Sequence, residues 1–240
     1  MLKSIWFETI VKLNPSKRIN KISRDSLPHL LNCLLKIGWV SEHTWIGRML
    51  AWWWRIELGK NSRFYGLPLF RRLPGSRIRI GDNCEFRSSQ WSNLVGLSRP
   101  CMVSTATRTG VVEIGNDCGF SGAIISCATR ISIGDRVKCE GNVTIIDSDR
   151  HATDWRDRLA GRSGATAPIE IGDDVWLGMN TIVLKGVSIG CRTIVQAGST
   201  VTRSLPNEVI AAGQPAVVVR KLTDDEQLES ASGCSFRNNK

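Results

Sequence analysis

An all-β parallel solenoid is the fold class that the sequence predicts, preceded by a basic, helical N-terminal segment. Three observations lead to it: bulky apolar residues recur every six positions, glycines recur beside them, and positive charge gathers near the N-terminus. Neither a 3.6-residue helix nor a two-residue strand alternation keeps a six-residue phase over many copies. In a β-solenoid with this period, each unit forms one flat face of a triangular prism and points its apolar residue inward.

The strictest repeat begins at Ile169, in the segment IEIGDDVWLGMNTIVLKGVSIGCRTIVQAGSTVT. Its inward positions, six residues apart, are Ile171, Leu177, Val183, Ile189, Val195 and Val201. Earlier copies keep the same phase at Ile80, Phe86, Ile114, Phe120, Ile133, Cys139 and Ile145. The solenoid is therefore expected at about 77–206. Because glycine tolerates a positive φ, we expect the prism corners at Gly172, Gly178, Gly186, Gly190 and Gly198.

Residues 1–76 form a different region. Residues 1–80 hold 15 Lys and Arg against four acids, which leaves 17 basic and 18 acidic residues for the rest of the chain. Six of the nine tryptophans lie there too, and basic residues beside aromatic ones suit a lipid–water interface. We expect a mainly helical segment that either contacts the inner membrane surface or packs as a cap over the solenoid.

Composition and motifs exclude several classes. No apolar stretch reaches the roughly 18 residues of a spanning helix. The first apolar run, Ile5 to Val11, is cut by Glu8 and lacks a signal-peptide cleavage site, so a cytoplasmic protein is expected. The eight cysteines show no CxxC pairing, which favours reduced, mostly structural thiols. Nucleic-acid binding is not expected, because the repeats are nearly neutral and carry no recognition motif.

The hexad phase breaks after Ile145, and residues 147–168 are expected to form a loop outside the prism. A long excursion from a rigid scaffold often carries function. This one contains His151, the only histidine beyond the N-terminal segment. A zinc site would need about three imidazole ligands, so a single histidine predicts no metal. Asp149 is the expected partner of the imidazole, with a solvated acidic loop as the alternative for Asp147 and Asp149 alike.

Together these features resemble the hexapeptide-repeat acetyltransferases, especially the branch that O-acetylates sugars in capsule, exopolysaccharide and lipopolysaccharide biosynthesis. The resemblance covers about residues 60–222. It is carried by IIDSDRH, APIEIGDDVWLGMNTIVLKGVSIG, AGSTVTRSLP and AGQPAVVVRKL, in the family's order. It implies a left-handed parallel β-helix, acetyl-CoA as acyl donor, a sugar or glycan acceptor, and a homotrimer with active sites between adjacent prisms.

The resemblance also implies roles for individual residues. His151 is the general base that deprotonates the acceptor hydroxyl for direct attack on the thioester. The implied acceptor contacts are Trp176, for which simple packing is the alternative, and Ser121 or Asn142, which stand where many relatives have an Asn. The implied acetyl-CoA contacts are Gly178, Met179, Ala197, Thr202, Arg203 and Arg220. Val217 departs from the family, where Lys or Arg is common at that position.

Two other functions remain open from the residues. One is a non-catalytic solenoid that serves as a binding or structural module, although a spacer has no reason to carry the loop with its single histidine. The other is an N-acetyltransferase that acts on an amino sugar. Residues 207–240 are expected to form a C-terminal cap and a flexible tail in either case.

Overall fold

The structure is a computed structural model that describes residues 26–223, and the chain divides after Trp39 into two compact units. Helix α2 (Ser26–Trp53) runs across that division. Its part within the first unit exposes Leu27, Leu31 and Leu35. Among the described residues, no helix is both long and apolar enough to cross a membrane. Residues 1–25 of the basic segment and residues 224–240 of the expected C-terminal cap and tail lie outside the described residues.

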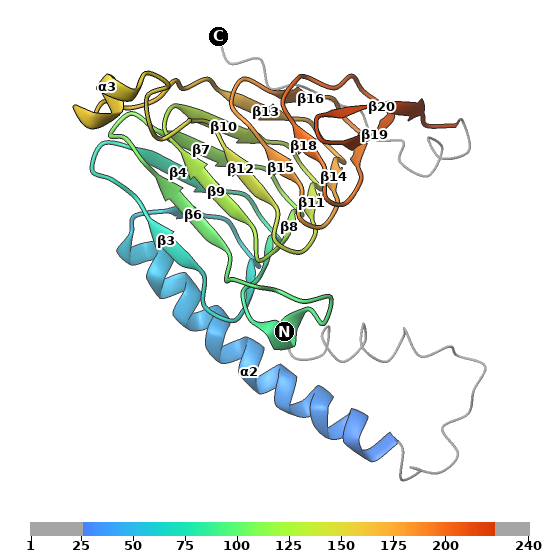
Figure 1. Cartoon of the computed structure of the whole chain (residues 1–240). Coiled ribbons are helices and arrows are strands. Elements are labelled where there is room, and N and C mark those ends of the chain that lie inside the picture. Colours follow the sequence, from blue (N-terminus) through green and yellow to red (C-terminus); the bar gives the residue numbers. More distant parts are fainter. Residues whose placement is uncertain (1–25, 224–240) are drawn as a thin grey trace. The chain divides into compact units, whose positions relative to one another are not determined.

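The second unit contains the solenoid, whose three parallel sheets form the faces of a prism (Figure 1). The first sheet has the order β1 (Glu57–Leu58), β4 (Arg77–Ile80), β7 (Val111–Ile114), β10 (Arg130–Ile133), β13 (Ile169–Ile171) and β16 (Ser188–Ile189). The second has β2 (Arg63–Tyr65), β5 (Glu85–Arg87), β8 (Gly119–Ser121), β11 (Lys138–Cys139), β14 (Trp176–Leu177), β17 (Ile194–Val195), β19 (Val209–Gly213) and β20 (Ala216–Lys221). The third has β3 (Leu69–Arg71), β6 (Met102–Thr105), β9 (Ile124–Cys127), β12 (Thr144–Ile146), β15 (Ile182–Val183) and β18 (Thr200–Val201).

Each coil of the solenoid contributes one strand to each sheet in turn, so the predicted all-β parallel architecture is confirmed. Every hexad position named above is buried, which confirms the inward phase. The core of the first coils is aromatic: Phe86 stacks between Phe64 and Phe120, with ring centroids 5.3 and 5.1 Å apart. At the other end β20 pairs antiparallel with β19, which gives this sheet a final strand that does not continue the coil.

The first coil begins at Glu57, earlier than the expected start at 77. Strands β1, β2 and β3 pair in parallel with the next coil, and Phe64 lies opposite Phe86. The six-residue step is in fact present at Leu58, Phe64 and Phe70. These positions lie within the basic segment 1–76 that was expected to be mainly helical, so the expected start is wrong by one coil. The helical part of the N-terminal segment correspondingly ends at Trp53.

The expected role of the corner glycines holds for only some of them. Gly186 and Gly198 have positive φ, at 75° and 72°. Gly172, Gly178 and Gly190 do not, but a Cβ on each would stand 2.7, 2.5 and 2.3 Å from atoms of the next coil. These three are needed for coil stacking rather than for turning. The turn from the first to the second sheet instead uses positive φ at Asn61, Asn83, Asp117, Arg136, Asp174, Arg192 and Glu208.

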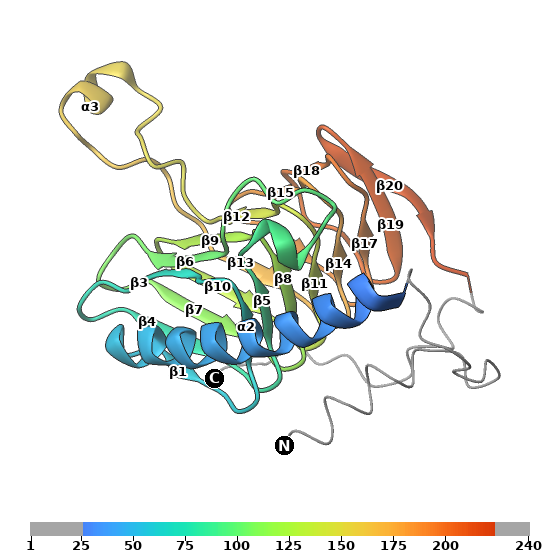
Figure 2. The same ribbon diagram turned by 90° about the horizontal axis from the view of Figure 1, so that it is seen from below.

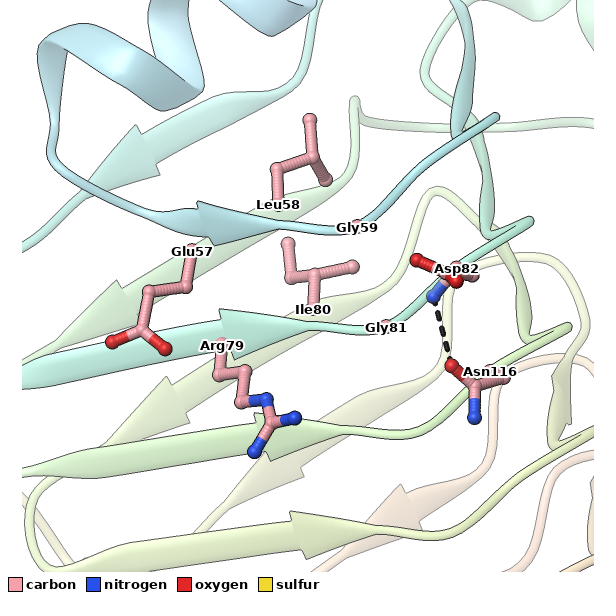
Figure 3. A pocket seen from close by; sticks show the side chains of 8 residues that line it. All are labelled: Glu57, Leu58, Gly59, Arg79, Ile80, Gly81, Asp82 and Asn116. Carbon is pink, nitrogen blue, oxygen red and sulfur yellow. Dashed lines mark hydrogen bonds between the residues drawn. The ribbon is translucent and has the colours of Figure 1, made fainter.

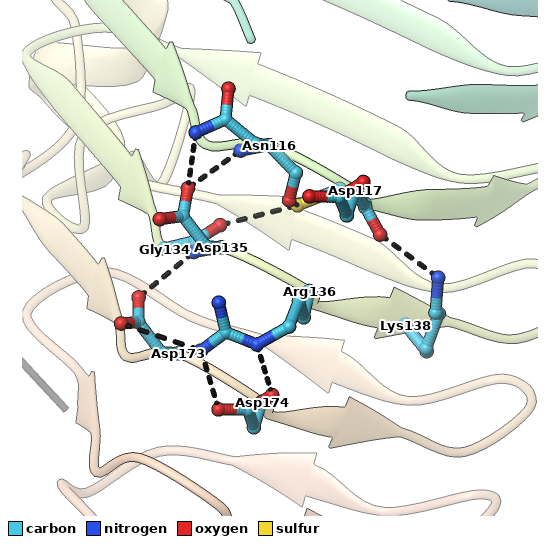
Figure 4. A network of polar contacts seen from close by, with 9 residues as sticks. Asn116, Asp117, Gly134, Asp135, Arg136, Lys138, Asp173 and Asp174 are labelled. Atoms are coloured by element: carbon cyan, nitrogen blue, oxygen red, sulfur yellow. Dashed lines mark hydrogen bonds and ion pairs between the residues drawn. The ribbon is translucent and has the colours of Figure 1, made fainter. Parts of the chain in front are cut away.

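A ladder of polar side chains holds this first–second corner together (Figure 4). The backbone N–H of Asn116 donates to Asp135 Oδ1 at 2.6 Å, and that of Asp135 donates to Asp173 Oδ1 at 2.8 Å. Arg136 donates to both oxygens of Asp174 at 2.6 and 2.8 Å, and this hydrogen-bonded partner raises the pKa of Arg136. The backbone groups at the turns are therefore satisfied from one coil to the next.

A shallow depression lies at the same corner in the first coils (Figure 3). Its lining residues are Glu57, Leu58, Gly59, Arg79, Ile80, Gly81, Asp82 and Asn116. Asp82 N donates to Asn116 Oδ1 at 2.9 Å, which continues the ladder into the depression. None of the predicted site residues lines it, so it belongs to the turn structure.

The described cysteines are mostly structural. Six of them form no disulfide: Cys33, Cys84, Cys101, Cys118, Cys127 and Cys139. Cys191, by contrast, is disulfide-bonded, so the expectation of reduced thiols is wrong at this position. Local spacing such as CxxC carries no information about pairing between cysteines far apart in a sequence.

Candidate functional site

Residues 147–168 form an arm that leaves the prism between β12 and β13, at the corner of the third and first sheets. Its two sides are joined at the root by an isolated antiparallel bridge, since Asp149 N donates to Ala165 O at 3.0 Å and Ala167 N donates to Asp147 O at 3.0 Å. Helix α3 (Trp155–Leu159) forms the tip, which Figure 2 shows well away from the sheets. The predicted break in the repeat is thus an ordered, projecting hairpin.

Asp147 anchors the root of the arm. Its side chain is completely buried and accepts four hydrogen bonds of 2.6–3.0 Å, from the backbone of Ala128, Thr129 and Arg130 and from the Thr129 hydroxyl. Burial and this neighbouring carboxylate raise the pKa of Cys127 to about 12. A solvated acidic loop, the alternative considered above, is therefore wrong for Asp147.

Asp149 fixes the arm to the following coil. Its Oδ1 accepts a hydrogen bond from Lys185 Nζ at 2.6 Å. The expected pairing of Asp149 with the His151 imidazole is absent among the described residues, because Lys185 reaches the carboxylate from the next coil instead. Asp149 consequently positions the chain around His151 rather than the ring itself.

His151 follows these anchors directly. Its backbone N–H donates to Asp149 O at 2.7 Å, and Arg150 before it has a positive φ of 63°. The Arg150 guanidinium donates to Ser126 Oγ at 2.5 Å, which ties this turn to the third sheet. The side chain of His151 is exposed, and no described residue hydrogen-bonds to its imidazole. The ring is therefore free to take a proton from a bound hydroxyl.

Trp176 and Met179 lie on another part of the prism. Trp176 is 47 % exposed on the outer surface of β14, between Lys138 and Ile194 of the neighbouring strands. The N–H of Gly178 donates to Val195 O at 2.8 Å and is not free for a substrate, so this part of the predicted acyl contact is wrong. No described residue accepts a hydrogen bond from the N–H of Met179. Of the two predicted donors to the acyl oxygen, only the backbone N–H of Met179 is therefore available.

A second excursion, the 88–101 loop, occupies the edge where acceptor contacts were predicted. Asn142 Oδ1 accepts from Ser98 N and Ser98 Oγ, both at 3.0 Å, and Asn142 Nδ2 donates to Gly96 O at 3.1 Å. Arg99 Nη2 also donates to Asn142 O at 2.6 Å. The Asn142 amide is therefore used up within the chain and is not free to bind an acceptor. Ser121, the other candidate, is buried.

The remaining predicted contacts lie on the later coils. Ala197 follows β17, at the corner of the second and third sheets. Thr202 and Arg203 follow β18 and are exposed at the third–first corner, the same corner as the arm. Arg220 is exposed on β20, where its Nη1 donates to Lys221 O at 3.1 Å. Among the described residues, no group of three or more His, Cys, Asp or Glu is placed to hold a metal ion.

One chain does not bring all these residues together. The corner that carries His151 is the vertex of the prism opposite the second sheet, where Trp176 lies. Met179 lies at the second–third corner, so the third sheet separates it from His151. A catalytic centre with His151 beside Trp176 and Met179 therefore needs residues of two chains.

Residues 168–203 match the family model described as bacterial transferase hexapeptide (six repeats). These residues therefore carry the hexapeptide repeat that the model describes. It is 40 % identical to the galactoside O-acetyltransferase of Lactococcus lactis over 149 residues, 61 % of this chain and 64 % of the relative. It is 36 % identical to the galactoside O-acetyltransferase of Escherichia coli over 97 residues, 40 % of this chain and 47 % of the relative.

A solved structure shows the same fold. The N-acyltransferase AntD of Bacillus cereus, crystallised as a point mutant in complex with dTDP and coenzyme A, aligns with a TM-score of 0.54 at 16 % identity. The alignment covers 72 % of this chain and 88 % of that one. The predicted left-handed parallel β-helix is confirmed. The chain spans about half the length of the curated relatives that it matches.

Proposed function

We propose that this protein transfers an acetyl group from acetyl-CoA to a hydroxyl of a sugar or glycan. The observation that carries the proposal is the exposed, unpartnered imidazole of His151 at the root of a firmly anchored arm. A sequence similar to galactoside O-acetyltransferases supports the acceptor class. A purely structural solenoid would gain nothing from fixing one histidine so tightly in an exposed position.

His151 acts as the general base in this proposal. The imidazole takes the proton of the acceptor hydroxyl while the hydroxyl oxygen attacks the thioester carbonyl of acetyl-CoA. The N–H of Met179 receives the oxyanion of the tetrahedral intermediate. The intermediate collapses with loss of the coenzyme A thiolate, which takes the proton back from the imidazolium. The products are the O-acetylated sugar and free coenzyme A, and no acyl-enzyme forms.

The site lies between copies of the chain, and the proposed assembly is a homotrimer. This arrangement follows from the placement of His151 and Trp176 on opposite sides of one prism. The tip of the arm suits such a contact, because Trp155 and Leu159 are 59 % and 83 % exposed there. An apolar pair at the end of an ordered hairpin is well placed to pack against a neighbour.

Acetyl-CoA lies along the later coils in this proposal. Ala197 leaves room for the slender pantetheine arm, and Thr202 lines its path. Arg203 and Arg220 supply positive charge for the nucleotide phosphates. Val217 offers no such charge, so the phosphates depend on the two arginines. Trp176 forms the wall of the acceptor site in this proposal, whereas the buried Ser121 does not contact the acceptor.

The proposed setting is the cytoplasm at the periphery of the inner membrane, because acetyl-CoA is made in the cytoplasm and lipid-linked glycans are assembled at that surface. The acceptor then belongs to capsule, exopolysaccharide or lipopolysaccharide biosynthesis. An amino sugar is the competing acceptor, and the two are separated by assaying matched hydroxyl and amino acceptors side by side. A hydrolysis-resistant amide product would show N-acetylation.

Replacement of the base tests the proposal. His151→Asn should lower the turnover of acetyl-CoA by about 10² to 10⁴, measured as free thiol released with a competent acceptor. His43→Asn, a histidine substitution on α2, is the matched control and should keep the wild-type rate. Because His151 is exposed, its variant should unfold within about 0.5 kcal/mol of the parent. A wild-type rate in His151→Asn would remove the proposed base.

A further inference from the structure

The part of α2 within the second unit, residues 40–53, carries two apolar faces. One packs on the first coil: Phe64 N donates to Thr44 Oγ1 at 3.1 Å, and Ala51 is 1 % exposed. A Cβ at Gly47 would stand 2.6 Å from the Phe64 ring, so helix and coil are in close contact there. This face covers the aromatic end of the solenoid core.

The opposite face of the same segment is bare. Trp45, Met49, Trp52 and Trp53, here named the tryptophan face, are 65, 46, 75 and 73 % exposed. Positions 45, 49 and 52 follow the i, i+4, i+7 spacing that puts side chains on one side of a helix. The packed face already covers the apolar end of the solenoid core, so these four residues are not needed for that purpose. An exposed apolar cluster of this size marks a binding surface.

The charges around the tryptophan face select its partner. The basic residues of the stretch 40–63 are Arg48, Arg55, Lys60 and Arg63, all exposed. Arg63 is paired with Glu85 at 3.8 Å, and Arg48 Nη2 donates to Ser62 O at 3.4 Å. The acids of the same stretch are Glu42 and Glu57, and Glu57 is paired with Arg77 at 2.8 Å in two hydrogen bonds. Tryptophan prefers the headgroup level of a bilayer, and flanking Lys and Arg are attracted to anionic lipid. A second copy of the chain would bring an equally basic face and be repelled.

We propose that the tryptophan face binds the surface of an anionic bilayer, with Trp45, Trp52 and Trp53 among the headgroups and Arg48 and Arg55 against lipid phosphate. The sequence left capping of the solenoid and contact with the membrane as alternatives. In this proposal the helix does both, each with a different face. The first coil faces the lipid in this arrangement, and the arm lies on later coils. The inference goes beyond acetyl transfer and stands without it.

Vesicle binding by the full-length protein tests the inference. We compare vesicles of phosphatidylcholine with vesicles that also contain phosphatidylglycerol, and the wild type with a triple variant, Trp45→Gln, Trp52→Gln and Trp53→Gln. The wild type should partition onto the anionic vesicles and be released as salt rises. The triple variant should bind at least about tenfold more weakly. Trp91→Gln, which removes a tryptophan 75 % exposed on the 88–101 loop, is the matched control and should bind as the wild type does.

Three results would overturn the inference: no binding of the wild type to anionic vesicles, equal binding by the triple variant, or an equal loss in Trp91→Gln. If the triple variant instead dissociates the wild-type oligomer in sedimentation, the tryptophan face is a contact between copies. A second variant, Arg48→Glu with Arg55→Glu, keeps the apolar face intact and should lose the preference for anionic lipid. Unchanged circular dichroism shows that each variant is folded.

Discussion

Two excursions leave the same solenoid, and they are tethered in opposite ways. The 88–101 loop is held along its second half, where Gly96, Ser98 and Arg99 all bond to Asn142. The arm at 147–168 is held at its root, where Asp147, Asp149 and Arg150 bind three separate parts of the coils. The first excursion is folded onto its own chain, whereas the second holds its tip away from the sheets (Figure 2).

This difference shows how a rigid scaffold can present a reactive group. Three side chains within four residues, those of Asp147, Asp149 and Arg150, tie the root of the arm to the coils. His151 follows them directly, and no described residue hydrogen-bonds to its ring. In the 88–101 loop, the polar groups instead hold the loop against the edge of the solenoid. Hydrogen bonds of the same kind therefore hold His151 in an exposed position in the arm, and cover an edge in the loop. The comparison predicts that removing one anchor from each will have different consequences.

The largest effect on stability is expected at the arm. Asp147→Ala leaves five hydrogen-bond donors without their acceptor: three backbone N–H groups, the Thr129 hydroxyl and the Cys127 thiol. We expect a loss of about 3–5 kcal/mol in the free energy of unfolding, by analogy with other broken buried charge networks. Urea denaturation followed by circular dichroism measures it. A loss below about 1 kcal/mol would mean that the carboxylate is not the anchor described here.

A smaller effect is expected at the loop. Asn142→Ala removes bonds to Ser98 and Gly96 that lie closer to solvent, and we expect a loss of about 1–2 kcal/mol. Limited proteolysis should then cut within 88–101 while the repeats stay intact. Turnover of acetyl-CoA should change by less than about threefold, because the amide is not a substrate contact in this account. A loss of activity as large as that of His151→Asn would restore Asn142 to the acceptor site.

Much of the fold was predictable from the sequence, because the hexad period reports directly which side chains point inward. From Ile169 onward, the phase identified the buried residues, and its interruption before Ile169 identified the arm. The start of the solenoid was harder, since Phe64 and Phe70 lie within the basic, tryptophan-rich segment that was expected to be helical. The role of Gly172 and Gly190 in coil stacking could not be predicted either. Successive coils lie too close together there for a Cβ, and a repeat pattern in the sequence does not report that distance.

The site was predictable only in part. His151 could be found because it is the only histidine in the repeats, and its loop breaks a strict period. The contact between Asp149 and Lys185 joins residues 36 positions apart, and that between Asn142 and Ser98 joins residues 44 apart. Nothing local signals either pair. The separation of His151 from Trp176 likewise depends on which faces the strands occupy, which only the coil topology reveals.

The central claim is that each active site combines His151 of one chain with Met179 of another. Met179→Pro removes the free N–H without breaking a ladder bond, and His151→Ala removes the base, so each variant alone should be inactive. Co-assembled in equal amounts, the two variants should recover about a quarter of the wild-type turnover, since about that share of interchain sites would have both groups intact. Recovery in mixed trimers, confirmed by sedimentation, is the predicted result. Mixed trimers as inactive as either parent would contradict the claim, because they would place both groups in one chain.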